Sequence, residues 1–436
     1  MSTVNRNRVK PAVCGGEKAV TLAMPVWPVA GELEVERMTQ VVRSGKWSWL
    51  GAHEMAFSEE FAKFIGTRHS LCLANGTVTL RCALQAVGVE PGDEVIVPGL
   101  TWVATAQAAL DVGANVVLVD IDPETLCLDP VAVEAAITPK TKAIIPVHLY
   151  GCMCDMDALG ALARKHHLKI VEDVAHQHGS EWRGRRAGSL GDAGSYSFQQ
   201  SKILTSGEGG AITCDDDEVY RTCFALKQVG WMPDPEAAAE PGQAPKLVPG
   251  NHYGHNYRIT EMQAVLLRGG LSQLDDQNRR REAAAERIRA ALEKGGGPLR
   301  LPRKDPRVTR QSYYCLTMLY DGPSNGLSRE AYVWALNAEG LPAVGAYWPV
   351  YRSPLLNLYD RTSPVPFRDP GTIQDYGRLR LPNVEKAVKD RAVMLLHHHL
   401  LGNDEYIDQL IAAIRKVNDN LAAVATAWSE KEAGKS

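Results

Sequence analysis

The sequence predicts an α/β protein in which a mostly parallel central sheet is followed by a smaller α+β domain. Between residues 71 and 172, short aliphatic segments alternate with longer segments that have the hydrophobic period of a helix. The aliphatic segments are apolar throughout, which is typical of parallel strands covered on both faces. The chain has 436 residues, 45% of them hydrophobic, and is long enough to form two such domains.

The first part of the chain supplies the elements of this sheet. Residues 1–24 are expected to form a mobile arm, and amphipathic helices are expected at 31–45 and 54–66. The predicted strands cover residues 71–73, 94–97, 116–119, 143–147, 169–172 and 194–198. The predicted helices between them run from the Asn75–Gly76–Thr77 segment to 87, and over 101–112, 130–137 and 156–167. Ligands in such sheets bind beyond the carboxyl ends of the strands, where Asn75, Trp102, His148 and Asp173 are expected.

The second part is predicted to be less regular. Residues 231–250 are rich in proline, alanine and glycine and are expected to form an exposed loop. A long helix follows over 260–294, which Gly269–Gly270 is expected to kink or divide. Beyond a hinge, the remaining elements are a strand at 313–320 and helices at 329–339 and 406–424. We therefore divide the chain into an arm (1–24), a large domain (25–294) and a small domain (295–436).

Composition excludes several classes of function. The formal net charge of −3 provides no basic field for nucleic acid or an anionic membrane. The sequence has no apolar run that could span a bilayer and no secretion signal near Met1, so we expect a cytoplasmic protein. The nine cysteines are scattered, and neither the Cys152–Cys154 pair nor the histidine runs at 166–167 and 397–399 have the spacing of a metal site. No metal is expected.

Lys202 is the most informative residue. It follows the short aromatic segment 194–198 and precedes the glycine-rich segment Gly207–Glu208–Gly209–Gly210. About thirty residues upstream, another predicted strand ends at Asp173. A lysine and an aspartate at two strand ends are what pyridoxal phosphate chemistry requires, because the amine forms a Schiff base with the aldehyde and the carboxylate keeps the pyridine nitrogen protonated.

Two further positions are consistent with this cofactor. Gly76 and Thr77 begin a helix after a strand, where free amides and the helix dipole bind phosphate, although threonine also caps helices that bind no ligand. Trp102 could stack on a flat ring or belong to the core. Each position is ambiguous by itself. Their order, a phosphate loop, an aromatic residue, an acid and a lysine, each at a strand end of one sheet, favours pyridoxal phosphate.

On these residues the chain resembles the DegT/StrS-type sugar aminotransferases, which have the aspartate aminotransferase-like fold (fold type I of pyridoxal phosphate enzymes). The similarity runs from about residue 27 to 424. The segments that carry it are 74–77, 98–105, 145–151, 172–179, 197–210 and 254–258.

The resemblance implies a role for each matched residue. Lys202 is the Schiff-base lysine and proton shuttle, and Asp173 pairs with the pyridine nitrogen. Trp102 stacks on the ring, and His176, at a position where the family often has glutamine, contacts the ring oxygen. Gly76, Thr77 and Ser197 bind the phosphate, and Asn256 reaches the phosphate in the neighbouring subunit of a homodimer.

Within the family, the segments at 197–210, 309–314 and 396–398 are most similar to the glutamine-dependent ketocyclitol aminotransferases of aminoglycoside biosynthesis, which act on substrates such as scyllo-inosose. Arg310 is then a candidate for the carboxylate of the amino donor and His398 for acceptor hydroxyls. The alternatives are a 3-amino-5-hydroxybenzoate synthase, a nucleotide-keto-sugar aminotransferase, and a pyridoxal phosphate-binding partner without activity. A dinucleotide-dependent oxidoreductase is disfavoured because the Gly-x-Gly-x-x-Gly turn is absent after the first strand.

Overall fold

The computed structural model describes residues 9–237, 244–322, 326–358 and 374–434. Its centre is a seven-stranded sheet in the order β1-β9-β8-β5-β4-β2-β3. The strands are β1 (His69–Leu73), β2 (Glu94–Pro98), β3 (Asn115–Val119), β4 (Thr141–Ile144), β5 (Lys169–Asp173), β8 (Ala193–Ser197) and β9 (Gly210–Cys214). All neighbours from β8 to β3 pair in parallel, whereas β9 is antiparallel to both β1 and β8. The predicted α/β class with a mostly parallel sheet is confirmed.

Helices cover this sheet, and strongly apolar strands form the core between them; Val95, Ile96 and Val97 of β2 are fully buried. Several of the helices begin at a side-chain cap, as in α7, where Asp155 accepts a hydrogen bond from the Ala158 amide at 3.0 Å. The helices of this part are α2 (Glu32–Ser44), α3 (Ala52–Ile65), α4 (Gly76–Ala86), α5 (Ala104–Asp111), α6 (Pro130–Ala136), α7 (Met156–His166), α8 (Asp217–Lys227) and α9 (Glu261–Gly295). Within the described part of the chain, no helix is both long and apolar enough to cross a membrane.

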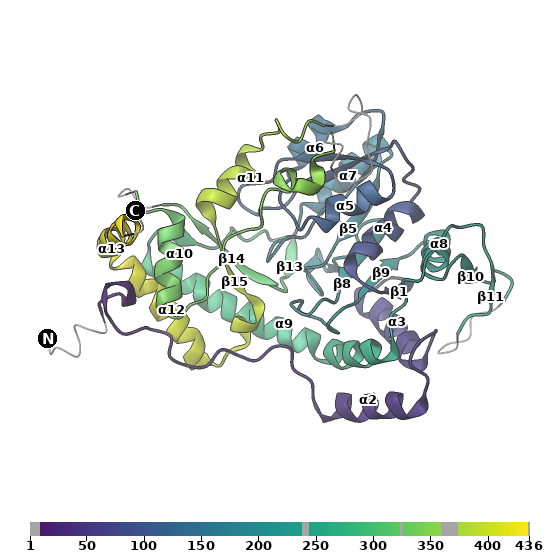
Figure 1. Ribbon diagram of the computed structural model, residues 1–436, viewed down its shortest axis with the longest axis horizontal. Helices are drawn as coiled ribbons and strands as arrows, with labels where there is room; N and C mark the ends of the chain where they lie inside the picture. Colours follow the sequence, from purple (N-terminus) through teal and green to yellow (C-terminus); the bar gives the residue numbers. More distant parts are fainter. Residues whose placement is uncertain (1–8, 238–243, 323–325, 359–373, 435–436) are drawn as a thin grey trace.

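The long helix α9 is continuous, so the expectation that Gly269–Gly270 divides it was wrong. The glycines serve close packing instead. A Cβ on Gly269 would lie 2.0 Å from the Glu34 carboxylate of α2, and one on Gly270 would lie 2.8 Å from Leu204. Figure 1 shows α9 running between the two parts of the molecule, and its two halves belong to two different hydrophobic clusters.

The second hydrophobic cluster covers one face of a three-stranded sheet formed by β12 (Leu299–Arg300), β14 (Cys315–Tyr320) and β15 (Ala392–Leu396). Its helices are α10 (Arg329–Ala338), α12 (Asp404–Asn418) and α13 (Leu421–Ala433), so the helix predicted at 406–424 is in fact two helices. A short helix, α11 (Pro382–Lys386), packs back on the first cluster through Val384. The domain boundary at residue 294 remains a prediction; α9 contributes to both clusters.

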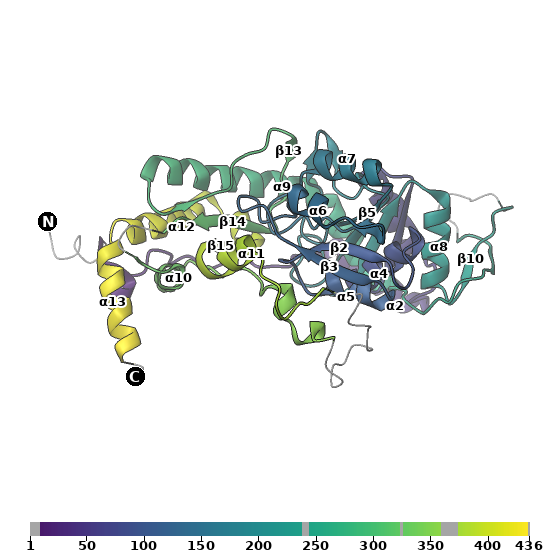
Figure 2. The same cartoon turned by 90° about the horizontal axis from the view of Figure 1, so that it is seen from above.

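Short strands complete the fold. β13 (Val308–Arg310) pairs with β6 (Glu181–Trp182), which pairs with β7 (Arg185–Arg186). The segment expected to be a loop at 231–250 contains an antiparallel hairpin, β10 (Trp231–Pro233) with β11 (Leu247–Pro249); residues 238–243 lie outside the described residues. Figure 2 shows this hairpin at the end of the molecule opposite α13.

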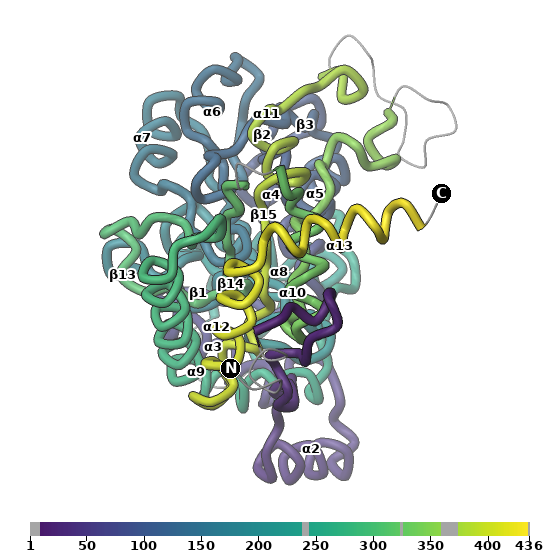
Figure 3. The backbone as a smooth tube through the Cα atoms, turned by 90° about the vertical axis from the view of Figure 1, so that its left-hand side faces the viewer, coloured from purple at the N-terminus to yellow at the C-terminus, as the bar shows by residue number. Residues whose placement is uncertain are grey.

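The described part of the N-terminal arm is attached, which corrects the expectation of a mobile segment. The Glu339 carboxylate accepts hydrogen bonds from the amides of Ala12 (2.7 Å) and Ala19 (2.9 Å), and Val20 is buried in the second cluster. Figure 3 shows the arm beside α10 and α12. Beyond residue 24 the chain crosses to α2, and this path brings Trp27 against the loop that carries Lys202, as described below.

Candidate active site

A cavity of about 570 Å³ lies at the carboxyl ends of β5 and β8 and at the start of α4, where the parallel sheet was expected to bind its ligand. Seven of the residues predicted for the site line this cavity: Gly76, Thr77, Trp102, Asp173, His176, Ser197 and Lys202. They come from segments spread over more than a hundred residues, and the strand order of the sheet brings them together.

Lys202 is held in a tight loop after β8. The Lys202 amide donates to the Gln199 carbonyl at 2.8 Å, and the Phe198 amide donates to the Gly209 carbonyl at 2.8 Å. Gly209 has a φ of 154°, a conformation that favours glycine, so the loop can close on the buried Phe198 ring. The glycine-rich segment therefore fixes the base of the lysine.

The Lys202 amine is buried without an acceptor. The residue is 9% exposed, and its Nζ lies 4.6 Å from the centre of the Tyr314 ring, with no hydrogen-bond acceptor within the described part of the chain. Burial lowers the pKa of Lys202 to about 8, although the Asp173 carboxylate opposes this shift. A buried, weakly basic amine suits covalent attachment to an aldehyde, because only the neutral amine attacks a carbonyl.

Asp173 is a buried acid. Its Oδ2 accepts a hydrogen bond from the Thr105 hydroxyl at 2.9 Å, and its Oδ1 accepts from the Ala175 amide at 3.1 Å. Burial raises the pKa of Asp173, and no cation contacts its oxygens directly among the residues described. A protonated pyridine nitrogen would provide the missing positive charge, so the carboxylate fits the cofactor.

The start of α4 fits a phosphate group. Asn75 caps the helix by accepting from the Val78 amide at 3.0 Å, whereas the amides of Gly76 and Thr77 have no acceptor in the described structure. Gly76 packs tightly on the end of β8, because a Cβ there would lie 2.7 Å from Cβ of Ser197. Two free amides beside a serine hydroxyl at a helix N-terminus form a suitable anion site.

His176 is neutral and has a defined tautomer. Its Nδ1 accepts from the Tyr150 amide at 3.1 Å, so Nε2 carries the proton, 3.4 Å from the Tyr347 hydroxyl. Burial lowers the pKa of His176, and the charge of Lys202 adds to this effect. The imidazole therefore provides an N–H donor without a charge.

Aromatic residues from other parts of the chain enclose the site. Tyr314 stacks on His176 with ring centroids 3.9 Å apart, and Tyr347 lies between His176 and Trp102. Trp102 is 59% exposed at the edge of the cavity rather than in the core. Sequence reasoning missed the roles of Tyr314, Tyr347 and Thr105, although Thr105 lies in the same segment as Trp102 and Tyr314 in one that carries the family resemblance.

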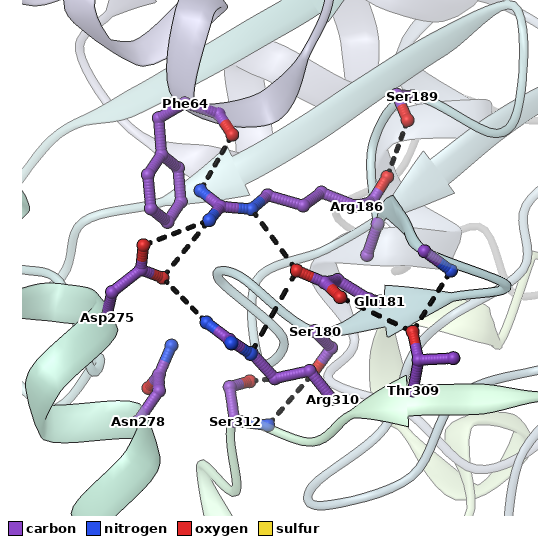
Figure 4. A network of polar contacts seen from close by, with 12 residues as sticks. Phe64, Ser180, Glu181, Arg186, Ser189, Asp275, Asn278, Thr309, Arg310 and Ser312 are labelled. Atoms are coloured by element: carbon purple, nitrogen blue, oxygen red, sulfur yellow. Dashed lines mark hydrogen bonds and ion pairs between the residues drawn. The ribbon is translucent and has the colours of Figure 1, made fainter.

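Three predicted residues lie outside this cavity. Asn256 is exposed and forms an isolated bridge with Gln228, and His398 Nε2 lies 3.3 Å from Sδ of Met24. Arg310 also lies outside, in the network of Figure 4, where Arg310 and Arg186 share the carboxylates of Asp275 and Glu181. The Arg310 charge is thus already compensated in this chain.

A second cavity, of about 870 Å³, lies between the two hydrophobic clusters and contains none of the predicted site residues. Many of its charged side chains pair with one another, as Arg307 does with Asp155 and Asp305. Among the described residues of its lining, no lysine pairs with a buried acid, so the smaller cavity is the candidate for the chemistry.

The fold and the buried lysine and aspartate define a pyridoxal phosphate-dependent enzyme. Comparison with known protein families agrees with this class. Residues 28–415 match the model of the DegT/DnrJ/EryC1/StrS aminotransferase family, and the chain belongs to this family. It is therefore a pyridoxal phosphate-dependent transaminase.

Two relatives come from Streptoalloteichus tenebrarius. The first, named L-glutamine:2-deoxy-scyllo-inosose aminotransferase, is 39% identical over 414 residues, which cover 93% of this chain and 97% of the relative. The second, provisionally named L-glutamine:3-amino-2,3-dideoxy-scyllo-inosose aminotransferase, is 39% identical over 419 residues, which cover 95% of this chain and 99% of the relative. The crystal structure of 3-amino-5-hydroxybenzoic acid synthase matches with a TM-score of 0.77 and 34% identity over 92% of this chain and 99% of that one.

Proposed function

We propose that the protein transfers an amino group from L-glutamine to a keto-cyclitol of the scyllo-inosose type in aminoglycoside biosynthesis. The main observation behind this proposal is the buried amine of Lys202, which has no acceptor among the described residues and shares its cavity with the Asp173 carboxylate. The names of relatives that align over more than nine tenths of the chain support glutamine as the donor and a keto-cyclitol as the acceptor.

In this proposal each cavity residue has a defined task. The cofactor, when bound, supplies an aldehyde and an electron-withdrawing ring that carries the amino group between the two substrates. Lys202 Nζ binds the cofactor at rest and, once released, moves the proton at the substrate carbon. Asp173 holds the positive charge of the pyridine nitrogen, and His176 donates Nε2–H toward the ring oxygen.

Four further residues would hold the cofactor. The amides of Gly76 and Thr77 and the Ser197 hydroxyl bind its phosphate. Trp102 covers one face of its ring. Reduction of the loaded protein with borohydride, followed by peptide mapping, tests the attachment: a pyridoxyl group on Lys202 is expected, and a labelled peptide that lacks Lys202 would refute the assignment.

The lining of the cavity favours an uncharged, hydroxyl-rich acceptor. Apart from the site residues named above, the polar residues of the lining are Thr101, Ser195, Gln199, Ser201 and Glu208. Lys202 is the sole lysine or arginine in the described lining. A nucleotide-linked keto-sugar carries a diphosphate, for which cationic side chains are the usual partners. The composition of the described lining therefore supports a keto-cyclitol over a nucleotide sugar.

Three acceptors distinguish the candidates. Purified protein is incubated with L-glutamine and 2-deoxy-scyllo-inosose, an aminated shikimate precursor, or a nucleotide-linked keto-sugar, and the products are identified by mass spectrometry. The proposal expects the amino-cyclitol. Turnover of the shikimate precursor would favour the 3-amino-5-hydroxybenzoate synthase alternative, which the structural similarity to that enzyme keeps open.

We further propose that the protein is a cytoplasmic homodimer with shared sites. Asn256 lies outside the cavity of its own chain. Two exposed aromatic residues belong to the same region: the Trp49 ring lies 4.7 Å from the guanidinium of Arg258, two residues after Asn256, and Tyr253 is three residues before it. Exposed aromatic surface of this kind is typical of interfaces. The unpaired state of all nine cysteines is consistent with a reducing compartment.

Mixing two inactive variants tests the shared site. Lys202→Ala and Asn256→Ala are each dissociated and recombined. If Asn256 serves the partner's cavity, one site of a mixed dimer has both native residues, and part of the activity returns. Recombined samples that stay as inactive as their parents, although mass measurements show mixed dimers, would refute sharing.

A further inference from the structure

Two fully buried polar residues of α9, Asn278 and Arg281, are connected by hydrogen bonds to the loop that carries Lys202 (residues 197–202, the lysine loop). Arg281 Nη1 donates to Asn278 Oδ1 at 3.0 Å. The other acceptors of the Arg281 guanidinium are neutral as well, Gln277 Oε1 at 3.4 Å and His397 Nδ1 at 3.3 Å. In the described structure no carboxylate pairs with Arg281. A buried cation without a counter-ion is destabilising, so its presence calls for an explanation.

From Arg281, one chain of hydrogen bonds leads to the residue before Lys202. Arginine can only donate, so His397 Nδ1 accepts from Arg281 and His397 Nε2 carries the proton. His397 Nε2–H then donates to the Ser201 carbonyl at 3.0 Å. Burial lowers the pKa of His397, and the charge of Arg281 lowers it further, so the imidazole stays neutral. The guanidinium thus selects the tautomer that can hold the lysine loop.

A second series of hydrogen bonds leads from α9 to the other end of the same loop. Asn278 Nδ2 donates to the His178 carbonyl at 2.9 Å, and His178 Nε2 lies 3.0 Å from the Ser197 carbonyl. A carbonyl only accepts, so His178 Nε2 carries the proton and donates. Ser197 ends β8 and lines the cavity. The two series of hydrogen bonds that start at α9 therefore reach backbone carbonyls at both ends of the segment 197–202.

The segment between the N-terminal arm and α2 adds a third donor. Trp27 Nε1 donates to the Lys202 carbonyl at 3.2 Å. The Trp27 ring lies edge-on to His397 with centroids 4.7 Å apart, and the Arg281 guanidinium lies 5.4 Å from its centre. Three neutral N–H groups thus donate to the carbonyls of Ser197, Ser201 and Lys202. Two of these donors belong to His397 and Trp27, and Arg281 contacts both side chains.

We propose that Arg281 is a positioning residue for Lys202, which acts through His397 and Asn278 to fix both ends of the loop and so directs Nζ into the cavity. This inference rests on the proposed role of Lys202. Because the contacts are to backbone carbonyls rather than to the amine, Arg281 sets where the amine lies and does not touch the reacting atoms.

Arg281→Met tests the proposal, with Arg289→Met as the matched control. Arg289 lies on the same helix and is mostly buried, but its bonds go to Pro302 and Glu286, away from the lysine loop. Apoprotein is mixed with pyridoxal phosphate, and the rate of uptake and the pH midpoint of the absorbance change of the bound cofactor are measured. We expect Arg281→Met to slow uptake on the order of tenfold and to shift the midpoint. Arg289→Met should change neither.

Further variants decide the remaining outcomes. Arg281→Lys keeps a donor for His397 Nδ1, so it should restore most of the rate. Trp27→Phe removes only the N–H that donates to the Lys202 carbonyl and leaves Arg281 in place. It replaces Arg281→Met as the test if that variant does not fold. We expect a smaller change of the rate and of the midpoint in the same direction. Unchanged midpoints in folded Arg281→Met, or in Trp27→Phe where it stands in, would overturn the proposal. If borohydride labelling of the unmodified protein misses Lys202, the proposed function fails instead.

Discussion

The Thr105 hydroxyl donates a hydrogen bond to Oδ2 of Asp173 at 2.9 Å, and both side chains are buried. Thr105 lies in the first turn of α5, and its hydroxyl is also 3.0 Å from that of Thr101. Burial raises the pKa of Asp173, whereas the hydrogen bonds from Ala175 and Thr105 lower it. Thr105 therefore helps to keep Asp173 ionised, which its proposed task requires.

Thr105→Val should remove this support with little change in volume. We expect the pKa of Asp173 to rise further and kcat to fall on the order of tenfold, because a hydrogen bond to a charged acceptor is lost. Steady-state kinetics with glutamine, together with the absorbance of the bound cofactor, measure the effect. Thr105→Ser keeps the hydroxyl and should stay near the unmodified rate. Equal rates for the valine and serine variants would contradict this role.

The lowered pKa of Lys202 predicts a pH dependence of cofactor uptake. Only the neutral amine reacts, so the rate for apoprotein should rise with pH and level off above about 8, rather than near 10.5 as for an ordinary lysine. Stopped-flow absorbance between pH 6.5 and 10 measures it. Lys202→Ala provides the background. A rate that still rises steeply above pH 9.5 would show that burial does not depress the pKa of this amine.

The strand ends of the site could be predicted from the sequence, whereas its walls could not. Asp173 and Gly76 each lie at a change from strand to loop or helix, and parallel strands bring such positions to one edge. Tyr314 and Tyr347 come from beyond α9. Their approach depends on packing such as that of Gly151, where a Cβ would lie 2.2 Å from the Cys315 carbonyl. No local pattern encodes such contacts.

The sequence also does not show which charged side chains are free to bind a ligand. The sequence shows that Arg310 is cationic, but not that Asp275 of α9 and Glu181 of β6 already balance it. Conversely, the sequence does not indicate that Arg281 has no carboxylate partner in the described part of the structure. Partners that are distant along the chain decide whether a charge is free to bind a ligand, and only the folded structure supplies them.

Gly76→Ala should weaken cofactor binding. The added Cβ would lie 2.7 Å from Cβ of Ser197, so the start of α4 or the end of β8 must shift, and both are proposed to hold the phosphate. We expect the Kd for pyridoxal phosphate to rise on the order of a hundredfold, as measured by titration of apoprotein. In the control Gly295→Ala, the new Cβ meets nothing within 4 Å, and the Kd should not change. If Gly76→Ala binds as tightly as Gly295→Ala, the phosphate lies elsewhere.

The Tyr314 ring should matter more than its hydroxyl. The ring stacks on His176 at 3.9 Å and lies 4.6 Å from Lys202 Nζ, while the hydroxyl is 3.1 Å from Oγ of Ser201. Tyr314→Phe keeps the stack and removes only neutral hydrogen bonds, so kcat should fall by less than about fivefold. Tyr314→Ala leaves His176 unsupported and opens the space beside the amine, and we expect a loss of kcat on the order of a hundredfold.

The two tyrosine variants also differ in a second measurement. In Tyr314→Ala, water reaches the Lys202 amine, so the pKa of Lys202 should rise from about 8 toward its ordinary value, and cofactor uptake by the apoprotein should level off at higher pH. In Tyr314→Phe the ring still excludes water, so the levelling point should stay in place. If the phenylalanine variant loses as much activity as the alanine variant, the hydroxyl rather than the ring is the important group, and the stacking role assigned to Tyr314 is wrong.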